Sequence, residues 1–268
     1  MSLIDDLFNR LRASGEKALM PFVTAGDPDL SFTARILAEL DRRGCHLAEV
    51  GIPYSDPIAD GPVIQSSYTR ALERNTTLDQ ILTMLQTRTT PNQMPVITMI
   101  SFAIVLRWGL ERFVASAKAA GISGAIVPDL PLEESAPLAE VCRRGDFSLI
   151  QLVTPTTPRR RALQIAEAST GFVYYVSVTG ITGERNELPH DLIDSVGWLR
   201  EQTTLPVCIG FGISRAEHVR RLAPVADGLI VGSAIVRRIA AATDNTQDAV
   251  LTDVGDYVGE LLEALKPN

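Results

Sequence analysis

The sequence predicts an α/β fold, a single (β/α)8 barrel with an extra helix at each end. Eight short apolar segments alternate along the chain with segments whose apolar residues recur at helical spacing. The apolar segments are nearly continuous, as expected of parallel strands buried on both faces. The turn after the first strand reads TAGDPD, without the glycine fingerprint of an open, doubly wound sheet. A series that counts to eight therefore favours closure into a barrel.

The predicted elements begin with an amphipathic helix. Its apolar residues fall at helical spacing and are Leu3, Ile4, Leu7, Phe8 and Leu11. After a first strand at 18–24, Asp29 is placed to cap the second helix and Gly44 to end it. The other strands are expected at 47–52, 95–100, 124–127, 148–153, 171–178, 205–209 and 227–231.

Helical segments fill the spaces between these strands. They are expected at 63–73, 78–87, 110–120, 133–144 and 191–202, with further helices after strands five, seven and eight. Thr77 with Gln80, and Ser214 with Glu217, have the spacing of a capping box. Thr157 is expected to cap the helix after strand five, because the next residue is a proline that suits the first helical position.

The series ends with a helix that opens at Ser233 and with a terminal amphipathic helix. The apolar face of that last helix is carried by Val250, Val254, Tyr257, Leu261 and Leu265. No linker-like, low-complexity or charge-run segment interrupts the series. We therefore expect residues 1–268 to form one domain.

Composition and charge exclude several classes of protein. The chain is 46% hydrophobic and 21% charged, which is typical of a globular protein with a large core. Its formal charge of −7 and its lack of a basic run argue against binding nucleic acid or an anionic membrane. The N-terminal MSLIDDLFNR lacks the basic start and apolar core of a signal peptide, and no window could span a bilayer. We expect a cytoplasmic protein.

The cysteines and histidines do not suggest a metal site or a histidine catalyst. Cys45, Cys142 and Cys208 are far apart and form no CxxC or Cys/His cluster, so reduced thiols are expected. His46 lies at the start of strand two, and His218 is expected on a helix surface. We expect neither a metal nor a cofactor.

Two carboxylates frame the loop after the second strand, where the active site of such a barrel lies. Glu49 stands inside an apolar strand, where burial would raise its pKa and suit it to give and take a proton near neutrality. Asp60 closes the following loop, which is rich in Pro, Asp and Gly. The structural alternatives are a salt-bridged barrel glutamate and an aspartate that caps a helix or forms a turn.

Small residues after strands seven and eight predict a phosphate site. Gly212 and the pair Gly232 and Ser233 each precede a helix, and small residues let backbone N–H groups approach a phosphate there. The loop after strand six, around Thr182, has the composition of a lid that could exclude water. Ordinary turns and a plain surface loop are the alternatives.

At this point the sequence resembles a known family. The segments PFVTAGDPD, EVGIPYSDPIADGP, VPDLPLEES, VYYVSVTGITGER, IGFGIS and GSAIV are similar to those of tryptophan synthase alpha subunits, in the same order over nearly the whole chain. The resemblance implies a lyase that splits indole-3-glycerol phosphate into indole and glyceraldehyde 3-phosphate in tryptophan biosynthesis. It also implies an alpha2beta2 complex with a beta subunit, which binds pyridoxal phosphate and condenses the indole with serine.

The resemblance assigns roles by position. Glu49 matches the catalytic acid and base of a retro-aldol cleavage, and Asp60 matches the carboxylate that stabilises positive charge at the indole nitrogen. The apolar wall around the indole corresponds to Phe22, Ile64, Met99, Ile126 and Tyr174. The phosphate cradle corresponds to Gly183, Gly212, Gly232 and Ser233. Thr182 matches a lid residue that orders Asp60, and Asp56 with Pro57 match the loop that contacts the beta subunit.

One segment departs from the family pattern. Where the family commonly reads MTYYNP, this chain has Met99 followed by Ile100, Ser101, Phe102, Ala103 and Ile104. In the family this segment lines the site and meets the beta subunit. The departure bears on coupling to that partner more than on the chemistry.

Three other functions are open to such a chain. A free-standing lyase would release indole rapidly without a beta subunit. A catalytically quiet paralogue would serve mainly as a partner of the beta subunit, but need not keep Glu49, Asp60 and Thr182. An isomerase of another phosphate sugar would need its own base and electrophile, and no histidine is placed to polarise a carbonyl.

Overall fold

The strands of this protein close into a barrel. The computed structural model describes residues 2–57, 60–88, 93–176, 192–210, 212–243 and 245–266. Within them eight parallel strands pair in chain order, and the last pairs with the first. They are β1 (Ala18–Thr24), β2 (Ala48–Gly51), β3 (Val96–Met99), β4 (Ile122–Ile126), β5 (Ser148–Val153), β6 (Val173–Val176), β7 (Val207–Gly210) and β8 (Gly228–Val231). The (β/α)8 TIM barrel expected from the sequence is confirmed.

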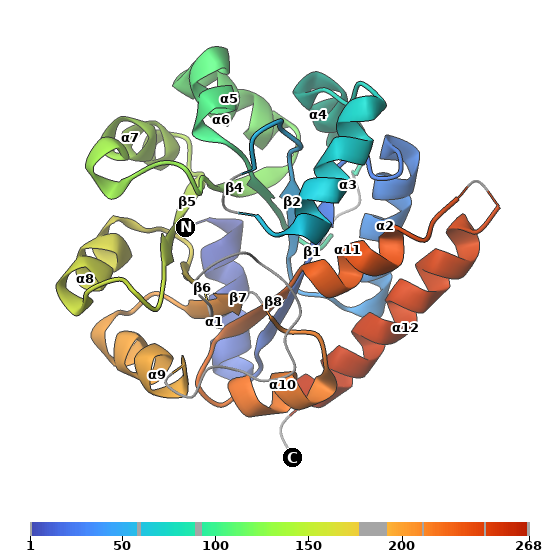
Figure 1. The fold of residues 1–268 in the computed structure, drawn as a ribbon. Helices are drawn as coiled ribbons and strands as arrows, with labels where there is room; N and C mark the ends of the chain where they lie inside the picture. The colour runs from blue at the N-terminus through green and yellow to red at the C-terminus, as the bar shows by residue number, and fades with distance from the viewer. Residues whose placement is uncertain are drawn as a thin grey trace.

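Helices form an outer layer around the strands, as Figure 1 shows. The α-helices of the described residues are α1 (Leu3–Ser14), α2 (Leu30–Arg43), α3 (Pro62–Glu73), α4 (Leu78–Gln86), α5 (Phe102–Trp108), α6 (Leu110–Ala119), α7 (Ala136–Arg144), α8 (Arg159–Ala168), α9 (Leu192–Gln202), α10 (Ala216–Leu222), α11 (Ser233–Ile239) and α12 (Gln247–Leu265). The extra helices at the two ends of the chain are α1 and α12, as predicted. The last helix, α12, packs on α2, α10 and α11.

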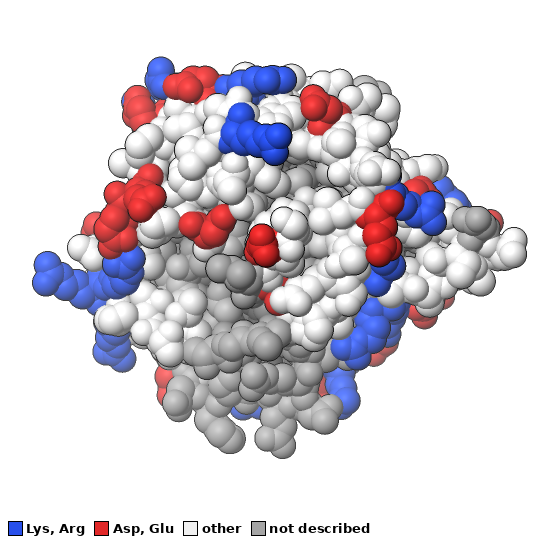
Figure 2. All heavy atoms as spheres, turned by 45° about the horizontal axis from the view of Figure 1, so that its top comes forward, with Lys and Arg blue, Asp and Glu red and all other residues white. Residues whose placement is uncertain are grey.

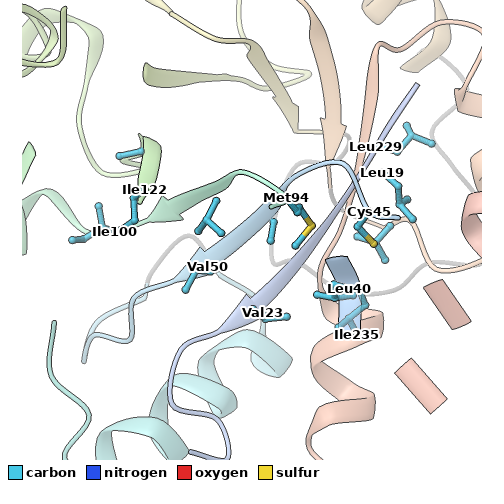
Figure 3. Close-up of a cluster of buried hydrophobic side chains, with 14 of the residues drawn as sticks. Leu19, Val23, Leu40, Cys45, Val50, Met94, Ile100, Ile122, Leu229 and Ile235 are labelled. Carbon is cyan, nitrogen blue, oxygen red and sulfur yellow. The ribbon is translucent and has the colours of Figure 1, made fainter. Parts of the chain in front are cut away.

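Side chains alternate along the strands and so build two separate cores. On β1, Leu19 and Val23 point outward and pack against helix residues such as Leu40 of α2 (Figure 3). Met20 and Phe22 point inward, into a second cluster that fills the barrel. Burial on both faces explains why the strands read as continuous apolar runs rather than as alternating ones.

The N-terminal end of the barrel is closed by α1. Of the apolar face predicted for this helix, Ile4, Leu7, Phe8 and Leu11 belong to the same cluster as the barrel interior, whereas Leu3 is exposed. The rings of Phe8 and Phe172, which precedes β6, lie 5.8 Å apart. The hydroxyl of Ser2, the N-cap of α1, lies 3.2 Å from that of Ser148 at the start of β5. With this end closed, the C-terminal ends of the strands are left for a site.

Two of the predicted helix caps are confirmed. The carboxylate of Asp29 accepts a hydrogen bond from the backbone N–H of Phe32 at 2.7 Å, at the start of α2. Thr77 and Gln80 exchange both hydrogen bonds of a capping box at the start of α4. Each of these bonds joins residues three apart in the chain, so local sequence was enough to predict them.

The capping box predicted for α10 is wrong. The N-cap is Arg215, and no side chain caps the helix. The backbone N–H of Ser214 instead donates to Nδ1 of His218 at 3.4 Å. His218 is therefore buried, although the sequence placed it on a helix surface. The acceptor for the Ser214 N–H is thus the ring nitrogen of His218, four residues later, and not the carboxylate of Glu217.

Two further local predictions fail near strands three and five. The hydroxyl of Thr157 accepts a bond from the N–H of Thr154 at 3.0 Å, within the preceding turn, and Pro158 takes the N-cap position of α8. The helix α5 was not predicted, because at seven residues it is too short to show a helical period.

The surface and the thiols agree with the composition. Acidic and basic side chains are interspersed over the face drawn in Figure 2. Among the described helices, none is long and apolar enough to cross a bilayer. The three cysteines are buried and free, and burial raises the pKa of Cys45 and of Cys142 to about 12.

Candidate active site

A cavity opens at the C-terminal ends of the strands. It is lined by Phe22, Glu49, Asp60, Ile64, Met99, Tyr174, Gly212, Ile213, Ile230, Gly232 and Ser233. These residues come from β1, β2, β3, β6 and β8, from α3 and α11, and from the loops between strands and helices. Residues far apart in the chain thus meet at the end of the barrel where the sequence places the site.

Most of the site residues predicted from the sequence line this cavity. Ile126 does not: it lies on β4 beside Met99, fully buried in the inner core. Thr182 and Gly183 lie outside the described residues. Two lining residues, Ile213 and Ile230, were missed. Ile230 could have been found by counting two residues back along β8 from Gly232, since alternate residues share a face.

Glu49 is held in the barrel by the strands on each side of it. It pairs in register with Phe22 of β1 and with Ile97 of β3. Its neighbours Ala48 and Val50 belong to the outer core, so alternation turns the Glu49 side chain inward, toward the cavity.

The carboxyl group of Glu49 is buried without compensation from the described residues. Only 1% of the residue is exposed, and neither side-chain oxygen has a hydrogen-bond partner among them. Burial, and then the charge of Asp60, raise the pKa of Glu49 to about 8. At neutral pH this group is mostly protonated, and it can lose the proton at little cost. The salt-bridged alternative has no support within the described residues, because no ion pair joins Glu49 to any of them.

Asp60 lines the cavity from the end of the β2–α3 loop. Its backbone is fixed: its N–H donates to the carbonyl of Pro57 at 3.2 Å, and its own carbonyl accepts from Nε2 of Gln65 at 2.7 Å. Its side chain is buried, and Oδ2 has no partner among the described residues. Burial raises the pKa of Asp60 to about 6, so this carboxyl ionises well before that of Glu49. It is not the helix cap of the alternative interpretation, since Gly61 is the N-cap of α3.

Two glycines make room for the aromatic wall. A Cβ atom at Gly51 would lie 2.5 Å from Cζ of Phe22, and one at Gly210 would lie 2.0 Å from the hydroxyl oxygen of Tyr174. Neither position could carry a side chain while the two rings stay where they are. Each glycine therefore leaves room for an aromatic ring of the neighbouring strand to line the cavity.

This arrangement suits proton transfer to a flat, apolar substrate that carries a small polar group. Two carboxyl groups with separated pKa values can serve as an acid and as a fixed negative charge in the same cavity. The surrounding side chains are mostly apolar, and they would exclude water from the reacting atoms. Small residues stand on the β7 and β8 side, where backbone N–H groups can meet an anion.

Comparison with known proteins identifies the family. The model of the family described as "Tryptophan synthase alpha chain" matches residues 8–265. This chain belongs to that family. It is 53% identical over 276 residues to the tryptophan synthase alpha chain of Rhodopirellula baltica, with 99% of each chain covered. The alpha chain of Synechococcus sp. (strain CC9902) is 45% identical over 258 residues, which cover 96% of this chain and 95% of that one.

Solved structures of tryptophan synthases have the same fold. Subunit alpha from Legionella pneumophila str. Paris superposes with a TM-score of 0.89 at 33% identity, covering 99% of this chain and 98% of that one. A chain of Mycobacterium tuberculosis tryptophan synthase gives a TM-score of 0.90 at 29% identity, covering 100% and 99%. The resemblance drawn from the sequence motifs is thereby confirmed, and an isomerase of another family is set aside.

The segment that departs from the motif of tryptophan synthase alpha chains forms the start of α5. The Ser101 hydroxyl donates to Asp129 at 2.7 Å, and the other carboxylate oxygen of Asp129 accepts from the N–H of Phe102 at 2.7 Å. Ala103 is exposed and Ile104 is half-buried. None of these four chain-specific positions is among the described residues that line the cavity. The departure thus leaves the described wall of the site intact.

Proposed function

We propose that Glu49 and Asp60 carry out the cleavage of indole-3-glycerol phosphate in this chain. As a member of the tryptophan synthase alpha chain family, the protein is a carbon–carbon lyase that forms indole and glyceraldehyde 3-phosphate in tryptophan biosynthesis. The assignment of residues rests on one observation: two buried carboxyl groups line the same apolar cavity. Both oxygens of Glu49 and Oδ2 of Asp60 have no hydrogen-bond partner among the described residues.

Glu49 supplies and recovers one proton in the proposed reaction. The protonated carboxyl group, favoured by its pKa of about 8, gives a proton to the ring carbon that bears the glycerol side chain. The resulting carboxylate removes the proton from the adjacent side-chain hydroxyl. The carbon–carbon bond then breaks, its electrons return to the indole ring, and the hydroxyl carbon becomes the aldehyde. Glu49 ends the cycle protonated, as it began.

Asp60 stabilises the charge that forms between these two steps. Protonation of the ring carbon places positive charge on the indole nitrogen, and an ionised carboxylate beside it lowers the energy of that state. The lower pKa of Asp60, about 6, leaves this group ionised while Glu49 is protonated. Burial strengthens the interaction, because little water screens it.

The remaining lining residues are proposed to hold the two ends of the substrate. Phe22, Ile64, Met99 and Tyr174, with Ile213 and Ile230, would enclose the indole ring. Gly212, Gly232 and Ser233 would bind the phosphate through backbone N–H groups. Ile126 would support Met99 from the neighbouring strand. Thr182 and Gly183 remain proposed as parts of the cover and the cradle.

We further propose that the chain works with a beta subunit in an alpha2beta2 complex. Asp56, which is exposed, and Pro57, which is half-buried, lie in the loop that leads to Asp60 and are the proposed contacts. In this proposal the alpha chain is one domain over residues 1–268, is cytoplasmic and uses no cofactor of its own.

The test is indole release by the purified chain, with and without a cognate beta subunit. Slow release that rises strongly with the beta subunit is the expected result. Fast release that the beta subunit leaves unchanged would favour the free-standing lyase. Absence of release under both conditions would favour the catalytically quiet paralogue and overturn the proposed roles of Glu49 and Asp60.

A further inference from the structure

The hydroxyl group of Tyr68 is buried, and nothing so far explains it. Tyr68 is 1% exposed, and its hydroxyl has no hydrogen-bond partner among the described residues. The same is true there of both oxygens of Glu49 and of Oδ2 of Asp60. An unpaired buried hydroxyl costs stability, so it calls for an explanation of its own.

Tyr68 is fixed directly behind the wall of the cavity. It follows Ile64 by one turn of α3, and Ile64 lines the cavity. The helix is tied to β1 by a 2.6 Å hydrogen bond between the hydroxyls of Ser67 and Thr24. A Cβ atom at Gly51 would lie 2.9 Å from the Tyr68 hydroxyl and 2.5 Å from Cζ of Phe22. The Tyr68 hydroxyl and the tip of the Phe22 ring are therefore close neighbours.

The loop that carries Asp60 lies against the Tyr68 ring. Tyr54, near the start of this loop, has its ring 5.6 Å from that of Tyr68, at an interplanar angle of 48°. Burial raises the pKa of Tyr68, and the charge of Asp60 raises it further, ahead of the contributions of Tyr54 and Glu49. The phenol is thus a permanent hydrogen-bond donor, and Asp60 is the carboxyl group with the stronger electrostatic effect on it.

We propose that Tyr68 is a positioning residue for Asp60, whose ionised carboxylate accepts a hydrogen bond from the Tyr68 hydroxyl when an indole ring occupies the cavity. Asp60 is a better acceptor than Glu49, because Asp60 ionises first and Glu49 stays protonated at neutral pH. The bond would hold one carboxylate oxygen and leave the other directed at the indole nitrogen. This inference rests on the proposed function.

Removing the donor should shift the pH dependence of the reaction. A hydrogen bond to the charged form lowers the pKa of a carboxyl group, so Tyr68→Phe should raise that of Asp60 in the complex. The other titratable groups that face this place are Glu49 on β2, Tyr54 in the loop and Tyr174 on β6. Arg70, one half-turn further along α3, is engaged by Asp27 instead, at 2.6 and 2.8 Å.

The experiment compares Tyr68→Phe with the wild-type chain, both in complex with the beta subunit, by kcat and KM between pH 5 and 9. The acid limb of kcat should move up by about one pH unit, so kcat should fall by up to about tenfold at the acid end of that limb and stay unchanged on the plateau. Tyr175→Phe is the matched control. It removes the hydroxyl of a tyrosine of the outer core that interacts with Ser195, and it should leave the acid limb in place.

Thermal unfolding separates this role from a structural one. Because the hydroxyl has no hydrogen-bond partner among the described residues, Tyr68→Phe should not lower the Tm. A lowered Tm with a uniform loss of kcat at every pH would overturn the proposal, and so would an unchanged acid limb.

Binding of indole alone provides a test that does not require turnover. Isothermal titration from pH 5 to 8 should show the midpoint of indole affinity shifted up by about one pH unit in Tyr68→Phe. If Tyr68→Phe shifts this midpoint but the wild-type chain does not cleave indole-3-glycerol phosphate, the Tyr68 assignment stands and the proposed function is rejected. If the two chains have the same midpoint and the wild-type chain cleaves its substrate normally, the Tyr68 assignment is rejected and the proposed function stands.

Discussion

Two aspartates follow neighbouring strands at the same end of the barrel, and their surroundings are opposite. Asp27, after β1, is 3% exposed and accepts two hydrogen bonds from the guanidinium group of Arg70. Asp60, after β2, is 5% exposed, and its Oδ2 has no partner among the described residues. Both residues stand in loops of Gly, Asp and Pro, so composition does not separate them. Burial alone therefore does not mark a functional carboxylate; burial without a partner does.

The same difference separates Glu49 from the buried hydroxyl groups of Thr98, Thr24 and Ser67. Thr98, on the next strand, donates to the carbonyl of Val50 at 2.9 Å, and the hydroxyls of Thr24 and Ser67 satisfy each other. These groups stabilise the fold at little electrostatic cost. Glu49 and Asp60 have raised pKa values instead, which costs stability and leaves them free to react with a ligand.

The largest expected effect comes from removing the proton of Glu49. Glu49→Gln keeps the shape of the side chain but can neither give nor take a proton, so kcat should fall by about 10³-fold while substrate binding persists. Indole release and substrate affinity are the measurements. Glu140→Gln, at an exposed position on α7, is the control that should retain full activity. Appreciable turnover by Glu49→Gln would remove this residue from the mechanism.

The same variant should change how stability depends on pH. The pKa of Glu49 is raised in the folded state, so folding binds a proton, and stability falls as the pH rises from the ordinary value of 4.5 through about 8. Glu49→Gln should therefore be more stable than the wild type at pH 9, by on the order of 3 kcal/mol, and similar to it at pH 4. Urea unfolding at the two pH values measures this. An equal difference at both would mean that Glu49 is not protonated in the folded chain.

Breaking the pair at Asp27 should have the opposite pattern, a loss of stability with little loss of activity. Arg70→Met leaves a buried aspartate without its partner and should cost about 2 kcal/mol, after a discount for the partly exposed arginine. Arg42→Met is the control, since the Arg42 side chain is exposed and its ion pair with Glu39 should contribute little to stability. If the two variants unfolded at the same urea concentration, the contrast between Asp27 and Asp60 would lose its basis.

A smaller effect is expected at the proposed phosphate cradle. Gly212→Asp adds charge and bulk to the proposed cradle, and affinity for glyceraldehyde 3-phosphate should fall by about tenfold or more. Gly212 has a φ of +79°, so any side chain is strained there. Gly212→Ala shares that strain without the charge and should bind more tightly than the aspartate variant. Unchanged affinity in Gly212→Asp would refute the cradle.

Local sequence was sufficient wherever the physical cause was local. The count of eight strands follows from apolar runs, and the cap at Thr77 follows from a bond to a residue three positions away. Glu49 stood out because a carboxylate within an apolar run needs a reason to be there. The family motif added the apolar wall, of which Phe22, Ile64, Met99 and Tyr174 line the cavity.

Which side chains line the cavity, and which groups they bind, was decided only by closure of the barrel. Alternation along β4 turns Ile126 inward, but in the closed barrel it does not line the cavity, whereas Ile230 of β8 does. The residues near Asp27 in the chain do not reveal that Arg70, over forty residues later, binds its carboxylate. Those near Asp60 do not reveal that its Oδ2 has no partner among the described side chains. A sequence fixes which face a side chain takes, because that depends on backbone period. Which groups then share a buried space depends on how distant strands are brought into register, and that arises only when the sheet closes.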